Sequence, residues 1–302
     1  MRAWPLLAYA VLYALSLGVL SLREGLDPVE PLVVLATIGV GFSALAWWAT
    51  RGLTPRSVHV RAPRREGPGV LAYLALLTGF ITWGLPAVRA LASPGWPAEL
   101  LVLAAKLSAF VALPIWIWRR RFGYSVADLL PLRDGLRGHW RPTLVLSGAI
   151  VLFQALLGRA RTELPGLDPN GLTFLAFAGG FAWLVLDVGA VEEFTYRALL
   201  QTRLAAWADS DRLALVGAAV LFGLAHVPGL YLRPELMGEG VGASPSLLLA
   251  TSYSIVYTSV SGLYLGVLWL RTRNLWVVAV VHAAQDWLPT VLDSLQKGYL
   301  GA

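Results

Sequence analysis

The segment VEEFTYRALL, residues 191–200, places two adjacent carboxylates and an arginine inside a long apolar run. FLAFAGGFAWLVLDVGA precedes it and QTRLAAW follows it. Ionisable groups are costly in hydrocarbon, so they tend to lie where function needs them. Glu193 and Arg197 are four residues apart, which places them on one helical face, where they would pair. Glu192 lies about 100° away around the helix. We therefore expect Glu193 and Arg197 to be structural and Glu192 to be free for chemistry.

The composition of the whole chain is that of a membrane protein. Of its 302 residues, 57% are hydrophobic and only 14% are charged, and the mean hydropathy is +0.65. Apolar runs of about 20 residues, long enough to span a bilayer as helices, recur along nearly the whole length. The absence of cysteine excludes disulfides, thiolate metal ligands and cysteine catalysis. The sequence therefore predicts an all-α polytopic membrane protein, a bundle of about eight to ten transmembrane helices.

Two of the candidate spans, 174–190 and 191–206, form either one long helix or two helices with a break near Asp187–Gly189. The first span follows Met1-Arg2 and shows no small-residue cleavage site, so we expect a retained helix rather than a signal peptide. Arg89 and Lys106 fall within spans and are interpreted as snorkelling or pairing between helices. The other candidate spans are 4–22, 30–49, 70–92, 99–118, 143–158, 212–228, 245–270 and 274–295.

Most arginines lie between the apolar segments, above all in the loops 51–69 and 119–142. Basic loops stay on the cytoplasmic side, so we predict a cytoplasmic N-terminus and place Arg203 on the same side of the membrane. We expect the membrane to be a prokaryotic plasma membrane. This topology also explains the net charge of +6, which is therefore no indication of nucleic-acid binding. Segment 122–142 is either an amphipathic helix or an ordinary loop. Segment 228–244, rich in Gly and Pro, is predicted to be irregular.

Two later helices also carry polar residues at helical spacing. Phe222 and His226 share a face in LFGLAHVPG, and His282 and Asp286 share a face in VVHAAQDWL. Each pair alone is a weak signal, because an intramembrane histidine often only hydrogen-bonds a neighbouring helix. Three apolar helices with polar clusters are more informative, because each further buried polar group adds a desolvation cost.

A helical hairpin is predicted to bring Glu192 and His226 together. Segments 191–206 and 212–228 are joined by ADSD, residues 208–211. Glu192 lies 17 residues before position 209 and His226 lies 17 after it, so the two fall at the same depth in an antiparallel hairpin. A glutamate and a histidine with a water between them suit general-base hydrolysis. His282 would donate a hydrogen bond to the developing oxyanion.

Taken together, the three motifs resemble those of the CAAX protease and bacteriocin-processing family. These are intramembrane glutamate proteases, and they include the type II CAAX prenyl endopeptidases. The resemblance covers about residues 187–290, and it divides the chain into N-terminal transmembrane helices (1–170), where no match is evident, and a catalytic helical core (171–302). The motifs are Glu192-Glu193-x-x-x-Arg197, Phe222-x-x-x-His226 and His282-x-x-x-Asp286.

The resemblance implies an endopeptidase that cleaves a membrane-associated protein or peptide, prenylated substrates included. It implies that Glu192 and His226 activate water and that His282 and Asp286 stabilise the oxyanion. The remaining motif residues, Glu193, Arg197 and Phe222, would support the site. Some members carry Asn at the position of Asp286. Because an ionised aspartate cannot donate to an oxyanion, Asp286 must be either protonated or orienting His282.

Three alternatives stay open. A metal-dependent hydrolase is one, because Glu192, His226, His282 and Asp286 are metal ligands in type, although no HExxH motif is present. A proton-coupled transporter is another, because intramembrane Glu, His and Asp also relay protons, although no internal repeat is evident. The third is a non-proteolytic scaffold. No cofactor is expected, metal is left open, and the expected partners are a membrane-associated substrate and the lipid bilayer, with no nucleic acid and an undetermined oligomeric state.

Overall fold

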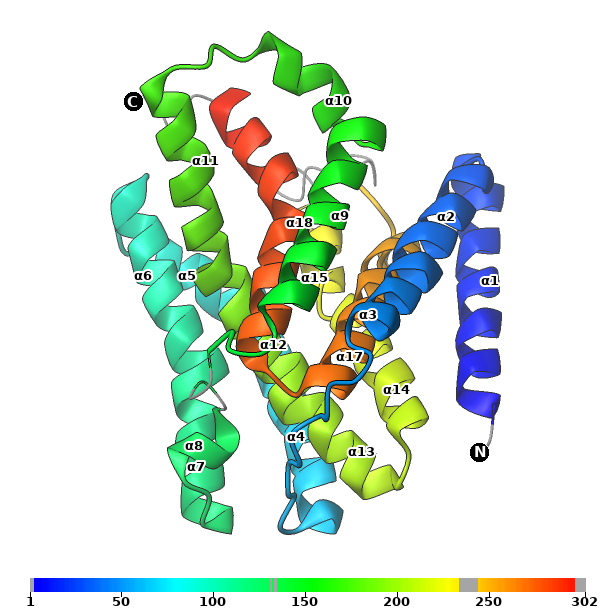
Figure 1. The fold of residues 1–302 in the computed structure, drawn as a ribbon, viewed down its shortest axis with the longest axis vertical. Helices are drawn as coiled ribbons and strands as arrows, with labels where there is room; N and C mark the ends of the chain where they lie inside the picture. Colours follow the sequence, from blue (N-terminus) through cyan, green and yellow to red (C-terminus); the bar gives the residue numbers. More distant parts are fainter. Residues whose placement is uncertain (1–2, 131, 133–134, 234–243, 297–302) are drawn as a thin grey trace. The chain divides into compact units, whose positions relative to one another are not determined.

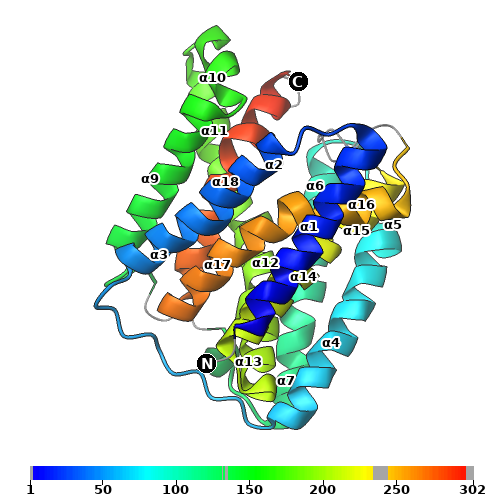
Figure 2. The ribbon, with the colours of Figure 1, turned by 90° about the vertical axis from the view of Figure 1, so that its right-hand side faces the viewer.

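The computed structural model describes residues 3–130, 132, 135–233 and 244–296 (Figure 1, Figure 2). All regular elements within these residues are helical, and nine helical runs among them are long and apolar enough to cross a membrane. The prediction of an all-α polytopic membrane protein is therefore confirmed. The nine runs are Trp4–Glu24, Val29–Ala49, Pro63–Arg89, Trp96–Phe122, Trp140–Leu157, Gly171–Ala208, Asp211–Leu232, Leu247–Thr272 and Leu275–Gln296.

The run Gly171–Ala208 is one uninterrupted helix and not two. Where a break was considered, near Asp187–Gly189, the helix passes through π-helical turns instead. Such turns bond i to i+5, recur at functional sites, and here lie on both sides of the two adjacent glutamates. The run consists of α11 (Gly171–Leu184), η5 (Val185–Ala190), α12 (Val191–Glu193), η6 (Phe194–Gln201) and α13 (Thr202–Ala208), of which η5 and η6 are π-helical.

The chain forms two compact units that interleave along the sequence. A boundary between them falls at Thr195–Tyr196, so Glu192 and Glu193 belong to unit 2 and Arg197 belongs to unit 1. The sequence-based division at residue 170 stays a prediction. Unit 1 comprises Met1–Trp48, Ser57–Ala87 and Tyr196–Arg271, and unit 2 comprises Ala49–Arg56, Val88–Thr195 and Thr272–Ala302.

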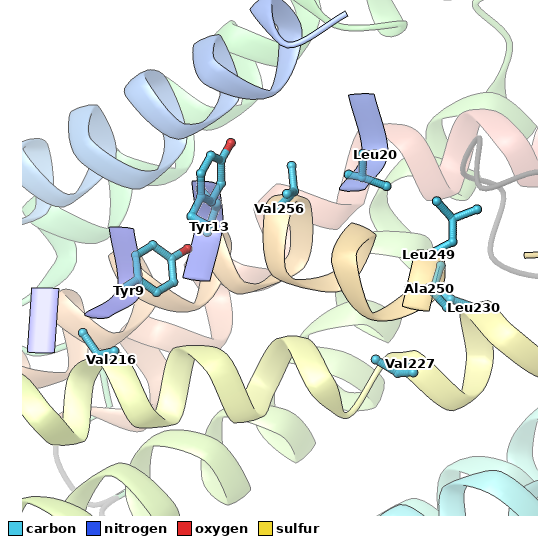
Figure 3. Close-up of a cluster of buried hydrophobic side chains, with 10 residues drawn as sticks. Tyr9, Tyr13, Leu20, Val216, Val227, Leu230, Leu249, Ala250 and Val256 are labelled. Atoms are coloured by element: carbon cyan, nitrogen blue, oxygen red, sulfur yellow. The ribbon is translucent and has the colours of Figure 1, made fainter. Parts of the chain in front are cut away.

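The core of unit 1 joins its first helix to the helices near the second motif. Tyr9, Tyr13 and Leu20 of α1 pack in one buried cluster with Val216 and Val256 (Figure 3). Helix α1 contacts α14, α16 and η8. Unit 1 contains α13 and the part of η6 from Tyr196 onward. Its other helices, of which α3, α5 and α17 end one or two residues beyond its boundaries, are α1 (Trp4–Glu24), α2 (Val29–Val34), η1 (Leu35–Phe42), α3 (Ser43–Ala49), α4 (Pro63–Gly79), η2 (Phe80–Gly84), α5 (Leu85–Arg89), α14 (Asp211–Leu224), α15 (Val227–Leu232), α16 (Leu247–Tyr253), η8 (Ser254–Thr258) and α17 (Ser259–Thr272).

Helices α13 and α14 form the predicted hairpin from Thr202 onward, and they pack against each other. Asp209 adopts the left-handed conformation at the turn, with φ of 49°. The Ser210 side chain then caps α14 by accepting from the backbone N–H of Leu213 at 3.2 Å. The hairpin is therefore built by a short turn with its own capping residue.

A buried ion pair corrects one of the sequence-based expectations. Helix α4 begins at Pro63, inside the segment predicted as a loop, and it buries the Glu66 side chain completely. The Glu66 Oε2 accepts from Arg203 Nε at 3.3 Å, and Arg203 Nη1 donates to the carbonyl of Ala198 at 2.7 Å. Arg203, which lies inside the predicted span 191–206, is only 2% exposed and packs between helices. Its guanidinium both pairs with Glu66 and binds a carbonyl of the π-helical stretch η6.

Replacing Arg203 by methionine is expected to lower the free energy of unfolding by about 3–5 kcal/mol, because the buried Glu66 carboxylate loses its ion pair with Arg203. Unfolding of the detergent-solubilised protein by heat and by denaturant would measure the loss. Arg89→Met is the matched control, because Arg89 pairs with Glu99 through side chains that are 54% and 39% exposed. An exposed pair contributes at most about 1 kcal/mol. Equal losses in the two variants would contradict a structural role for the buried pair.

Unit 2 surrounds the long helix α18 with α9, α11, η5 and α12 (Figure 1). Pro289 lies inside α18 and has no N–H, so the carbonyl of Gln285 loses its intrahelical donor. Gln154 Nε2 of α9 donates to that carbonyl instead. Besides α11, η5 and α12, the helices of unit 2 are α6 (Trp96–Lys106), η3 (Leu107–Ala112), α7 (Leu113–Phe122), α8 (Val126–Leu129), α9 (Trp140–Leu157), α10 (Ala160–Glu163), η4 (Leu164–Gly166) and α18 (Leu275–Gln296).

Lys106 and Asp187 form an ion pair between helices, which confirms one of the two interpretations of Lys106. The Lys106 Nζ lies 2.9 Å from each carboxylate oxygen of Asp187.

The loop interpretation holds for the described part of 122–142, where α8 is only four residues long. Segment 228–244 begins as helix α15 instead of irregular chain, and most of the remainder, 234–243, lies outside the described residues.

Candidate active site

Two helices of unit 2 approach each other closely beside the first motif. A Cβ atom on Gly189 would lie only 2.3 Å from the carbonyl oxygen of Ala279, so only glycine permits this contact between η5 and α18. Side chains in a helix lean toward its N-terminus. Glu193 therefore leans back toward Gly189, and His282 leans back toward Ala279. Both side chains are directed to the point where the two backbones are closest.

Glu193 and His282 meet at this point through a buried hydrogen bond. The His282 Nδ1 lies 2.8 Å from the Glu193 Oε1. Glu193 has no exposed surface and His282 is 3% exposed, so the contact is shielded from water. A carboxylate only accepts, so His282 carries its proton on Nδ1. The other ring nitrogen, Nε2, is directed away from Glu193.

The Nε2 side of His282 faces Asp286, one helical turn further along α18. Asp286 Oδ2 lies 3.6 Å from His282 Nε2, and the Asp286 side chain is 31% exposed. The shared face of His282 and Asp286 is therefore confirmed. Glu192 also lies close enough to interact electrostatically with His282. Its Oε2 is buried and has no hydrogen-bond partner among the described residues.

The structure adds a contact that spacing did not predict. Spacing predicted that Glu193 would pair with Arg197, and the resemblance left Asp286 either protonated or orienting His282. In the structure Glu193 itself holds the imidazole at Nδ1, at a shorter distance than Asp286 at Nε2. The pairing of Glu193 with Arg197 stays a prediction, because the two residues belong to different units. Sequence spacing could not indicate the Glu193–His282 contact, which joins residues 89 positions apart.

His226 lies at a break between two helices of unit 1. Pro228 cannot donate to the carbonyl of Leu224 and its ring would clash there, so α14 ends at Leu224 and α15 begins at Val227. The His226 Nδ1 lies 2.9 Å from the carbonyl oxygen of Phe222. A carbonyl only accepts, which places the proton on Nδ1 and leaves Nε2 as the acceptor of the neutral ring. This partly buried imidazole is therefore oriented to receive a proton or a water hydrogen at Nε2.

Phe222 fixes the position of His226 through ring contacts. The two rings meet edge to face with centroids 4.9 Å apart, which confirms their predicted shared face. The Arg197 guanidinium carbon lies 4.9 Å from the centre of the Phe222 ring, and Tyr196 packs against the same ring edge to face. Arg197 is fully buried. A desolvated cation over an aromatic face contributes on the order of 2 kcal/mol, so Arg197 supports the second motif within unit 1.

The predicted site residues thus fall into two groups. Unit 2 brings together Glu192, Glu193, His282 and Asp286, whereas unit 1 brings together Arg197, Phe222 and His226. The pairing of Glu192 with His226 stays a prediction. Among the described residues no group of three or more Asp, Glu or His side chains is arranged to hold a metal ion.

Alanine at position 189 is expected to lower the free energy of unfolding by about 1–3 kcal/mol, because its Cβ would overlap the Ala279 carbonyl and force η5 away from α18. The same displacement would lengthen the Glu193–His282 hydrogen bond. Gly179→Ala is the matched control, since a Cβ at Gly179 meets nothing within 4 Å. Thermal unfolding of both variants would measure the effect, and equal stability would contradict the close approach.

These features define an integral, multi-pass membrane protein with a buried carboxylate–imidazole cluster. Residues 172–288 match the family described as type II CAAX prenyl endopeptidase Rce1-like, which confirms the resemblance inferred from the motifs. The matched segment contains every predicted site residue but covers less than half of the chain. No curated protein and no solved structure matches the chain significantly. The family is one of proteases, so the match supports a membrane protease.

Proposed function

We propose that the protein is an intramembrane endopeptidase that hydrolyses a peptide bond of a membrane-associated protein or peptide. The observation that carries the proposal is the cluster of Glu192, Glu193, His282 and Asp286 on two packed helices. It combines a fixed imidazole with a neighbouring carboxylate whose buried Oε2 accepts no hydrogen bond from the described residues. The match of residues 172–288 to a protease family points to the same chemistry.

In the proposed reaction Glu192 acts as the general base. Its carboxylate takes a proton from water as the oxygen attacks the scissile carbonyl, and it later returns that proton to the leaving amine. His226 accepts a hydrogen from the same water at Nε2, the nitrogen that its bond to the Phe222 carbonyl leaves available. The pair therefore generates the nucleophile without a covalent enzyme intermediate.

His282 is assigned to the oxyanion. Its Nδ1 is engaged by Glu193, so Nε2 is the nitrogen that would donate to the developing negative charge. Asp286 lies near Nε2 and is more exposed than Glu193, the carboxylate at Nδ1. We assign Asp286 to orienting and stabilising the imidazolium, because an ionised carboxylate cannot donate to an oxyanion. Arg197 and Phe222 hold His226 in place.

The topology and the substrate belong to the same proposal. The basic loops support a cytoplasmic N-terminus, and the membrane is proposed to be a prokaryotic plasma membrane. Because the site lies on membrane-spanning helices, the substrate is a peptide or protein already associated with the bilayer, prenylated substrates included.

The test is cleavage of a panel of membrane-associated and prenylated peptides by the purified full-length protein, with and without EDTA. Cleavage that is insensitive to EDTA is the expected result. Cleavage that EDTA abolishes and a divalent metal restores would replace the glutamate mechanism with the metal-dependent alternative. No cleavage of any peptide, combined with proton flux in proteoliposomes, would favour the transporter alternative.

A further inference from the structure

A cavity of about 630 Å³ opens on one helix of unit 2, and none of the residues of the proposed reaction lines it. Its walls come from the end of η3 and from α7, together with one residue that follows α7. They are apolar at one end and basic at the other. The lining residues are Val111, Ala112, Ile115, Trp116, Arg119, Arg120 and Tyr124.

The order of these residues along the helix gives the cavity a direction. Residues four apart share a helical face, so the lining forms two parallel rows. Each row begins with small or branched apolar side chains and ends, about 12 Å further along at 1.5 Å per residue, with an arginine. One row consists of Val111, Ile115 and Arg119. The other consists of Ala112, Trp116 and Arg120.

The chain turns back on itself just after Arg119 and Arg120. Gly123 follows α7 in the left-handed conformation, with φ of 73°, and its N–H donates to the Arg119 carbonyl at 3.0 Å. This C-terminal cap reverses the chain, so that the buried side chain of Tyr124 lines the cavity beside the arginines. A phenol and two guanidiniums therefore surround the basic end.

Both arginines are available to an anion. Arg119 and Arg120 are exposed, and neither guanidinium forms an ion pair or a side-chain hydrogen bond within the described part of the chain. Guanidinium groups bind phosphate through two parallel hydrogen bonds. Trp116 is 58% exposed, as is usual for a tryptophan at the boundary between hydrocarbon and headgroups.

We propose that this cavity binds one anionic phospholipid. The phosphate lies on Arg119 and Arg120, and an acyl chain runs along Ile115 and Trp116 toward Val111. The two ends of the cavity match the two ends of such a lipid in charge, polarity and order along the helix. Basic residues at the edge of a membrane span are the recognised means of attracting anionic lipids.

The site lies next to the segment that carries the paired glutamates. Its wall residue Val111 belongs to η3, which contacts α12. The Thr195 hydroxyl, two residues after Glu193, donates to the carbonyl of Phe110 at 3.1 Å. A lipid that orders η3 would therefore also stabilise the position of α12 within unit 2. We expect lipid binding to raise thermal stability, whatever reaction the protein catalyses.

The test uses the purified full-length protein in detergent, titrated with a short-chain phosphatidylglycerol. Thermal unfolding and native mass spectrometry provide the two readouts. We expect saturable binding of one lipid and a rise in the unfolding temperature. Arg119→Gln and Arg120→Gln should each weaken the affinity about tenfold, the value of one charge-assisted hydrogen bond. Arg121→Gln removes the same charge from the same helix end, but Arg121 does not line the cavity. The affinity of this variant for the lipid should therefore equal that of the wild type.

Titrations with two other compounds show which part of the lipid is recognised. Phosphatidylcholine with the same chains should bind much more weakly, and inorganic phosphate alone should give no shift in unfolding temperature. A shift with inorganic phosphate that depends on Arg119 would instead define a site for soluble anions and overturn the lipid proposal. The lipid proposal would also be overturned if Arg121→Gln weakened lipid binding as much as Arg119→Gln and Arg120→Gln do. The same holds if Arg119→Gln and Arg120→Gln left the lipid affinity unchanged while unfolding at the wild-type temperature without lipid.

Discussion

Glu192→Gln is expected to lower kcat for peptide cleavage by about 10²- to 10⁴-fold, the contribution of a general base. The substitution keeps the size of the side chain and removes only its ability to take a proton. The buried Oε2 of Glu192 has no hydrogen-bond partner among the described residues, so the amide breaks no contact of that atom. The free energy of unfolding should therefore change by no more than about 1 kcal/mol.

Steady-state kinetics and thermal unfolding of the same preparation would separate these effects. KM should stay near the wild-type value, because the carboxylate acts on water and not on the bound peptide. Glu99→Gln provides the control for an equal change of charge at an exposed glutamate of unit 2. If Glu192→Gln cleaved at the wild-type rate, Glu192 would not be the base and the proposed mechanism would fail.

The helical fold was predictable because its signal is local. A run of about 20 apolar residues is sufficient to indicate a span, and the nine runs lie where the hydropathy placed them. The beginning of α4 was not predictable in the same way. The sequence around Glu66 is charged and contains Pro68, so it resembles a loop. It is helical and buried because Arg203, 137 positions away, pairs with Glu66.

The π-helical stretches mark a second limit of sequence reasoning. Nothing in the residue pattern of η5 distinguishes it from α-helix, and the Asp187–Gly189 segment suggested a break instead. In the structure Asp187 binds Lys106 and Gly189 permits the contact with Ala279. Both residues are explained by partners on other helices, which spacing along one helix cannot reveal.

The candidate site shows the same division between local and long-range information. The shared faces of Phe222 with His226 and of His282 with Asp286 followed from four-residue spacing, and both are observed. The donor to the Gln285 carbonyl is an example of long-range information that spacing does not contain. Pro289 indicates that this carbonyl needs a new partner, but only the packing of α9 on α18 supplies Gln154.

Glu193→Leu and His282→Leu are each expected to lower the free energy of unfolding by about 3 kcal/mol, because each leaves a buried polar partner without its hydrogen bond. The double variant replaces both polar groups by apolar ones of similar size. It should therefore recover part of the loss, with a coupling energy of about 1–3 kcal/mol between the two sites. Denaturant unfolding of the wild type, the two single variants and the double variant would complete the cycle.

The double variant also separates stability from catalysis. If His282 stabilises the oxyanion, cleavage should fall by about 10²- to 10³-fold in the double variant even though its stability is partly restored. If the pair only holds η5 against α18, activity should return together with stability. Additive losses would indicate that the 2.8 Å contact between Glu193 and His282 contributes nothing of its own. Restored stability without restored cleavage would show that the Glu193–His282 pair is required for the reaction as well as for packing, because only the reaction requires a donor at Nε2.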